Sequence, residues 1–141
     1  MLFVFAALIV GSAMAQLPKV NVTGNITTNT TWTNNKIYVL RDYIYVTQGA
    51  TLTIEPGTVI YGNDANSTAK GSLIITKGSK IMAVGTPCRP IVFTSGLSGG
   101  KRARGDWGGV ILLGKAKLNA PGDTAHIEGI PPTHFTLFGG G

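Results

Sequence analysis

The sequence predicts an all-β chain wound into a solenoid, a β-helix. Charged residues make up only 13% of the chain, whereas globular domains usually carry about 25%, and glycine is abundant at 20 residues. Apolar runs of three or four residues alternate with turn signals, and each run is too short for a typical helix. Strand–turn–strand segments of similar pattern recur after roughly 22 residues, which is typical of a solenoid.

The first 15 residues have the pattern of a secretory signal peptide. Residues 2–10 form an apolar core that is far shorter than the roughly 20 residues of a membrane span. Ala13-Met14-Ala15 is a small-x-small cleavage signal before Gln16. We therefore expect export across the inner membrane, a secreted or cell-surface protein that begins at Gln16, and no membrane span after cleavage.

The rest of the chain divides into a leader and a series of strands. Residues 16–35 are rich in Asn and Thr, so we expect a leader or an N-terminal cap there, followed by coils over residues 36–141. The expected strands are short runs rich in β-branched and aromatic side chains, some with period-two alternation. They lie at residues 37–40, 43–46, 51–54, 58–60, 73–76, 80–83, 91–94, 110–113 and 116–119.

Turn signals indicate how these strands coil. The turns carry Pro56-Gly57 and Lys77-Gly78 rather than the Asn-Gly or Asp-Gly pairs that hairpins prefer, so we expect coiling in one direction, with a β-sandwich as the alternative. The repeat aligns residues 51–60 with residues 73–83, and another coil is expected to begin at residues 126–130. Inward-facing, stacked side chains are expected at Leu52, Ile54, Ile75, Phe93 and Leu112.

Four segments, in order, resemble a known family. They are GATLTIEPGTVIYG, GSLIITKGSKIMAVGTPCRPIVFTS, RGDWGGVILLGKAKLNAPG and IEGI, and the similarity covers about residues 37–130. The chain is similar to large secreted β-helix proteins of Bacteroidetes and related bacteria, many of which carry a C-terminal type IX secretion sorting domain. The resemblance implies a right-handed parallel β-helix, of which this chain would be a truncated N-terminal part. It carries over no catalytic residues.

Charge and cysteine content limit the function classes. The net charge of +6 favours an anionic partner, but the basic residues are mostly scattered and no nucleic-acid-binding motif accompanies them, so no nucleic acid is expected. Cys88 is the single cysteine, which excludes an internal disulfide, and no thiol-enzyme signature surrounds it. We interpret Cys88 as a structural residue.

The acidic residues predict neither a catalytic nor a metal site. Six carboxylates are present, and the repeat spacing places no two of them on one face, so no glycosidase pair and no catalytic residue are predicted. Asn63, Asp64 and Asn66 form the one cluster of candidate calcium ligands, but they lack the order of a strong calcium loop. We interpret this cluster as a solvated loop and expect no metal and no cofactor.

Two loops interrupt the coils, at residues 62–71 and 96–108, and the second holds the candidate binding site. Lys101, Arg102 and Arg104 could pair with uronate, sulfate or phosphate groups. Trp107 could stack on a sugar ring. We favour the simpler interpretation for these residues, in which Trp107 packs on the coil and the basic run is a solvated face, and keep them as the binding-site candidates.

These observations favour a non-enzymatic β-helix that serves adhesion, matrix contact or glycan contact. Its expected partner is an acidic glycan or a cell-surface polysaccharide. The alternative is a carbohydrate-active enzyme, a polysaccharide lyase or hydrolase, whose catalytic coils lie beyond this chain. A carboxylate pair or a Lys/Arg/calcium cluster on one solvent-facing sheet would favour the enzyme.

Overall fold

The computed structural model describes residues 16–141, and the predicted signal peptide lies outside the described residues. Three parallel sheets make up most of the described chain. Sheet 1 contains β1 (Lys19–Val22), β3 (Ile37–Leu40), β6 (Val59–Tyr61) and β9 (Val92–Thr94). Sheet 2 contains β4 (Tyr43–Val46), β7 (Ser72–Ile75) and β10 (Gly109–Leu112). Sheet 3 contains β2 (Thr30–Trp32), β5 (Thr51–Ile54) and β8 (Lys80–Ala83).

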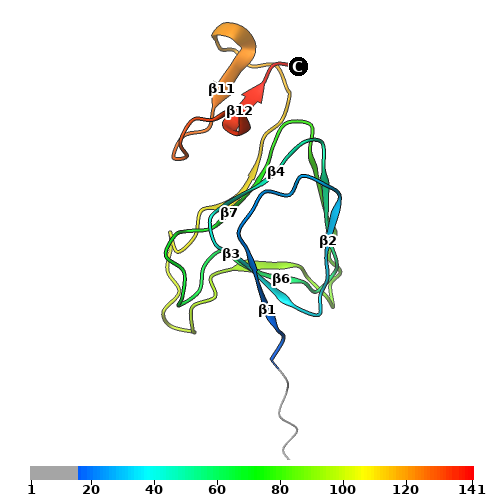
Figure 1. Cartoon of the computed structure of the whole chain (residues 1–141), viewed down its shortest axis with the longest axis vertical. Coiled ribbons are helices and arrows are strands. Elements are labelled where there is room, and N and C mark those ends of the chain that lie inside the picture. Colours follow the sequence, from blue (N-terminus) through cyan, green and yellow to red (C-terminus); the bar gives the residue numbers. More distant parts are fainter. Residues whose placement is uncertain (1–15) are drawn as a thin grey trace, which may run out of the picture.

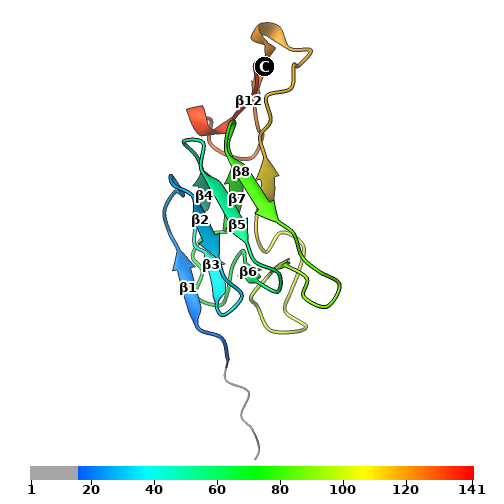
Figure 2. The same cartoon turned by 90° about the vertical axis from the view of Figure 1, so that its right-hand side faces the viewer.

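The chain visits the three sheets in turn, so successive strands of one sheet come from successive coils. Figure 1 shows the sheets as three sides of a coil, with β1, β3 and β6 on one side, β4 and β7 on the second, and β2 on the third. Figure 2 shows the strands following one another from β1 at one end to β8 at the other. Every strand pair within these sheets is parallel, which confirms the predicted parallel β-helix and excludes the sandwich.

The first coil is formed by the Asn/Thr-rich residues 16–35. Here β1 pairs with β3 and β2 pairs with β5, and between them Ile26 bridges Val46 in parallel. Later coils turn their corners at glycine. Gly57 and Gly78 have φ values of +86° and +83°, a left-handed conformation that glycine adopts without strain. These turns redirect the chain to the next sheet instead of reversing it into a hairpin.

The core is one apolar column inside the coil. Leu52, Ile54 and Ile75 are buried in it, as predicted, and Phe93 packs against it while only partly buried. Leu112 pairs with Ile75 and so occupies the next position of that rung. Its side chain is nevertheless 66% exposed, because no strand of the described residues covers this end of the column. The predicted stacking is therefore incomplete at Leu112.

The predicted repeat is out of phase with the structure. Residues 51–54 stack on residues 80–83, with Leu52 paired to Ile81, and not on residues 73–76. The two aligned units look alike because each crosses a corner of the coil through a glycine turn. They cross different corners, since the insertion at residues 62–71 delays β7.

Two further expectations for the C-terminal part are wrong. Residues 116–119 form no strand, and residues 126–130 begin no new coil. Instead, β11 (Thr124–His126) pairs antiparallel with β12 (Leu137–Gly139), and two short 3-10 helices, η1 (Pro121–Asp123) and η2 (His134–Thr136), adjoin this hairpin. Phe135 packs on Tyr45 at the outer face of sheet 2, with ring centroids 5.2 Å apart. Burial, followed by the nearby Tyr43 and Asp42, raises the pKa of Tyr45.

Candidate functional site

Two insertions meet at one corner of the coil. Residues 62–71 connect β6 to β7, and residues 96–108 connect β9 to β10. Because β6 neighbours β9 in sheet 1 and β7 neighbours β10 in sheet 2, the two insertions must stack on one another. The Gly96 N–H donates to the Asn63 carbonyl over 2.9 Å, and the Gly108 N–H donates to the Gly71 carbonyl over 2.9 Å.

A buried ion pair anchors the first insertion. The Asp64 side chain is only 3% exposed, and its Oδ1 lies 2.6 Å from Nη1 of Arg41, with Lys19 3.7 Å away. Burial alone would raise the pKa of Asp64, but hydrogen bonds from Arg41 and the Asn66 N–H, together with the two positive charges, outweigh burial and lower it. Asp64 therefore serves the structure of the loop. The interpretation of Asn63, Asp64 and Asn66 as a solvated loop is wrong for Asn63 and Asp64, because both are buried.

Trp107 anchors the second insertion. Its ring lies parallel to that of Phe93, with centroids 6.5 Å apart and 7° between the planes. A Cβ atom at Gly62 would collide with the indole, so the absence of a side chain at this position lets Trp107 approach the first insertion closely. Trp107 thus packs on the coil while remaining partly exposed.

A polar groove of about 470 Å³ lies between the two insertions, and we call it the loop groove. Its lining residues are Asn63, Ser67, Thr68, Ala69, Lys70, Arg104, Gly105 and Asp106. Asp106 accepts a hydrogen bond from the Ala103 N–H over 3.0 Å. That bond, a second one from Ser95 and the charge of Lys70 lower the pKa of Asp106. At neutral pH the groove therefore holds two cations and one carboxylate.

A second groove, of about 350 Å³, adjoins the first, and we call it the aromatic groove. Its lining residues are Phe93, Thr94, Ser95, Arg102, Ala103, Arg104 and Trp107. Arg104 lines both grooves, so a ligand longer than one sugar could contact it from either side. The Arg102 Nε donates to the Leu97 carbonyl over 2.8 Å, which holds this side chain across the loop.

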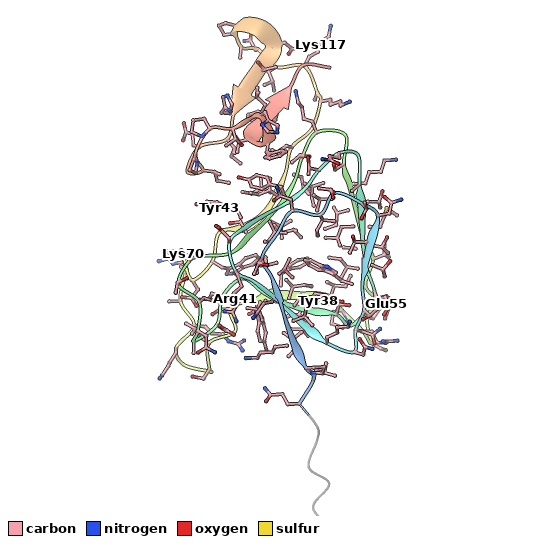
Figure 3. The ribbon with its side chains drawn as sticks, viewed as in Figure 1. Tyr38, Arg41, Tyr43, Glu55, Lys70 and Lys117 are labelled. Atoms are coloured by element: carbon pink, nitrogen blue, oxygen red, sulfur yellow. The ribbon has the colours of Figure 1, made fainter. Side chains whose placement is uncertain are left out.

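The structure brings together three of the four predicted site residues. Arg102, Arg104 and Trp107 line the aromatic groove, whereas Lys101 is exposed and lies outside the lining of both grooves. Sequence reasoning missed Lys70, which comes from the earlier insertion. Figure 3 shows Lys70 and Arg41 on the same side of the coil, opposite Glu55. The available signal was the position of the two loops, because insertions at the same corner of successive coils must touch.

Most carboxylates have structural partners. Five of the six, Asp42, Glu55, Asp64, Asp106 and Asp123, accept hydrogen bonds from nearby main-chain or side-chain donors. Within residues 16–141, no three or more His, Cys, Asp or Glu side chains gather as metal ligands would. Cys88 lies exposed in a tight turn where the Arg89 N–H donates to the Thr86 carbonyl, so burial in the core does not explain this residue.

Comparison with known protein families identifies the family of the chain's β-helix. A family model described as a pectate-lyase-like β-helix domain matches residues 24–139, which is most of the chain. No curated protein and no solved structure matches the chain. Across residues 16–141, none of the helices has the length and apolar character needed to cross a bilayer.

Proposed function

The chain belongs to the pectate-lyase-like β-helix family, and from this premise we propose that it is a secreted or cell-surface protein that binds an acidic glycan. The observation that supports the proposal is the junction of two grooves at Arg104. One groove adds Lys70 and the other adds Arg102 and the partly exposed rings of Phe93 and Trp107. The signal pattern at residues 13–15 supports export, and it also belongs to the proposal.

The charges of the grooves suit an anionic ligand. In the described part of the chain, both ion pairs use the same carboxylate, Asp64, so Lys70, Arg102 and Arg104 are left without an ion-pair partner. A guanidinium group presents paired N–H donors that match the geometry of a carboxylate or a sulfate. The aromatic rings beside them offer apolar area to the carbon face of a sugar. An alternating pattern of acidic and hydroxyl groups along a polysaccharide would satisfy both grooves.

The family description also fits a carbohydrate-active enzyme, and we favour a binder for this chain. Acid–base cleavage of a sugar needs carboxylates or basic groups that are free to exchange protons with the substrate. Five of the six carboxylates are committed to hydrogen bonds within the protein, and Asp64 is also committed to a buried ion pair. A hydrolase that uses a carboxylate pair would therefore need catalytic groups from further coils.

The test removes the two arginines and compares glycans of different charge. We expect the Arg102→Ser/Arg104→Ser variant to lose binding to polygalacturonate and to a sulfated glycan, as measured by calorimetry at low salt. Binding by the parent should weaken as salt rises, because exposed charges are screened beyond about 8 Å at physiological ionic strength. The matched control is Lys80→Ser/Lys117→Ser, which removes the same charge from exposed positions outside both grooves. Equal loss in both variants would contradict a defined site.

A further inference from the structure

The last coil has an unfilled position in sheet 3. This coil supplies β9 to sheet 1 and β10 to sheet 2, but sheet 3 ends at β8 in the described chain. Beside the open edge of β8, Ile81 and Met82 share a groove of about 310 Å³ with Leu112. Among residues 16–141, seven large apolar side chains are exposed, and five of them lie on or just after β8, β9 and β10. The open edge thus combines unpaired main-chain groups with exposed apolar surface.

The sequence after β10 carries the pattern of the missing strand. β10 pairs with β7 at a constant offset, with Ser72 opposite Gly109 and Ile75 opposite Leu112. The same offset places Lys117 opposite Lys80 and Leu118 opposite the inward-facing Ile81. It then places Asn119 opposite Met82 and Ala120 opposite Ala83. Residues 117–120 therefore match β8 in two respects: each segment begins with a lysine, and Leu118 and Ala120 fall at the inward positions of Ile81 and Ala83.

The chain follows the coil for a few residues and then leaves it. The ladder between β7 and β10 continues to Leu113, whose N–H donates to the Ile75 carbonyl over 2.9 Å. Lys115 still lies over the preceding corner, with its Cε 3.9 Å from where a Cβ of Gly78 would lie. Gly78 turns that corner with a φ of +83°, a conformation that is unfavourable for the lysine at the matching position.

After Lys115 the segment is held by the C-terminal hairpin. The Leu118 N–H donates to the Asp123 carboxylate, and the Leu118 side chain lies against Gly139. Gly139 in turn donates its N–H to the Gly114 carbonyl over 2.9 Å. Figure 3 shows Lys117 beside this hairpin, away from the coil. The Lys77 Nζ also donates to the Gly139 carbonyl over 3.0 Å, which ties the hairpin to the coil.

We propose that the open edge of β8 is a docking position for an extended strand, and that its occupant is residues 117–120 of the same chain. Docking pairs this segment in parallel with β8 and inserts Leu118 into the groove between Ile81 and Leu112. The structure shows the undocked arrangement, and docking is opposed by the left-handed conformation that Lys115 would have to adopt at the corner where the preceding coil has Gly78. Replacing Lys115 by glycine removes that opposition.

Disulfide trapping tests the register of the docked strand. In a Cys88→Ser background, Met82→Cys and Asn119→Cys place two outward thiols opposite each other on neighbouring strands. Neighbouring strands lie about 4.8 Å apart, within the 4.4–6.8 Å between Cα atoms that a disulfide spans. Glutathione disulfide accepts the two electrons, so one intramolecular disulfide forms and two glutathione thiols are released.

The matched control pairs Met82→Cys with Lys117→Cys, which is shifted by two residues along the same face. We expect the in-register pair to show at least a tenfold higher effective concentration than the control, measured in dilute protein spanning residues 16–141. Lys115→Gly should raise the effective concentration of the in-register pair further. Equal values for the two pairs would overturn the proposal. Crosslinks found only between molecules would overturn it too, because the occupant would then be a second copy.

Discussion

The two ends of the coil close the same apolar column in different ways. At the first coil, Trp32 is only 4% exposed and stacks on Tyr38, with ring centroids 4.6 Å apart and 14° between the planes. The Tyr38 hydroxyl also accepts a hydrogen bond from the Thr33 N–H over 2.9 Å. At the last coil, Phe93 and Trp107 lie 6.5 Å apart, and Leu112 is largely exposed. At the first coil a buried, stacked aromatic pair covers the apolar column, whereas the last coil has no such pair.

The difference lies in the strand of sheet 3. The first coil has β2 in this position, which brings Trp32 over the column, whereas the last coil has no strand there. Each coil of a solenoid buries its apolar face against its neighbours, so a terminal coil needs a cover of its own. The β11–β12 hairpin region supplies that cover only in part. Ile127 and Phe138 line a groove of about 400 Å³ with Leu112 and Leu113, but Leu112 stays 66% exposed.

The largest expected loss of stability comes from removing the aromatic pair at the first coil. Trp32→Ala should lower the free energy of unfolding by about 3–5 kcal/mol, because a large ring that stacks on Tyr38 leaves a cavity when it is removed. Phe93→Ala is the matched change at the open end. It should cost about half as much, because the ring is only partly buried. Urea denaturation of both variants measures the difference, and equal costs would show that the two ends are equally closed.

A smaller loss of stability is expected at the two insertions. The first insertion is anchored by the buried carboxylate of Asp64. Asp64→Asn should cost about 3 kcal/mol at pH 7, because it leaves Arg41 without its carboxylate. The folded-state pKa of Asp64 is lowered, so this stability is present above the ordinary aspartate value and is lost as pH falls below about 4. The variant should therefore show a flatter loss of stability between pH 5 and pH 2.

Asp106 provides the control for that experiment. Its pKa is also lowered, but it lies at the exposed loop groove and makes no buried ion pair. Asp106→Asn should lower the urea midpoint at pH 7 by much less than Asp64→Asn does, because the hydrogen bonds and the charge that lower the pKa of Asp106 lie at an open groove. A shift as large as that of Asp64→Asn would mean that both insertions are held by charge, and the contrast between them would disappear.

Much of the fold could be predicted from local pattern. Short apolar runs and glycine turns identify the strands because strand formation and corner geometry depend on neighbouring residues. The phase of the repeat could not be predicted in this way. The corners before β6 and before β8 have similar sequences, and only the pairing of Leu52 with Ile81 shows which strands stack. Residues 116–119 leave the coil because Leu118 contacts Asp123 and Gly139. The local sequence pattern of a strand does not reveal these contacts.

The candidate site shows the same division. The cluster of Arg102, Arg104 and Trp107 is visible in the sequence because its members are nearly adjacent. Lys70 comes from the preceding coil and joins them only when the two insertions stack, so a repeat aligned in the wrong phase conceals it. The packing of Trp107 depends on Gly62 in the other loop, and no local pattern links these two residues.

The smallest expected effect sharpens the comparison at the open end. Leu112→Ser alone should change the free energy of unfolding by no more than about 0.5 kcal/mol, because the leucine is mostly solvated. In a Lys115→Gly background, where the strand position over β8 can fill, the same change should cost about 1–2 kcal/mol, since Leu112 would then be buried beside Leu118. The increase is a coupling energy between two positions, and a double-mutant cycle in urea measures it. If Leu112→Ser lowers the free energy of unfolding equally in both backgrounds, residues 117–120 do not cover Leu112. The last coil would then stay open even when glycine replaces Lys115.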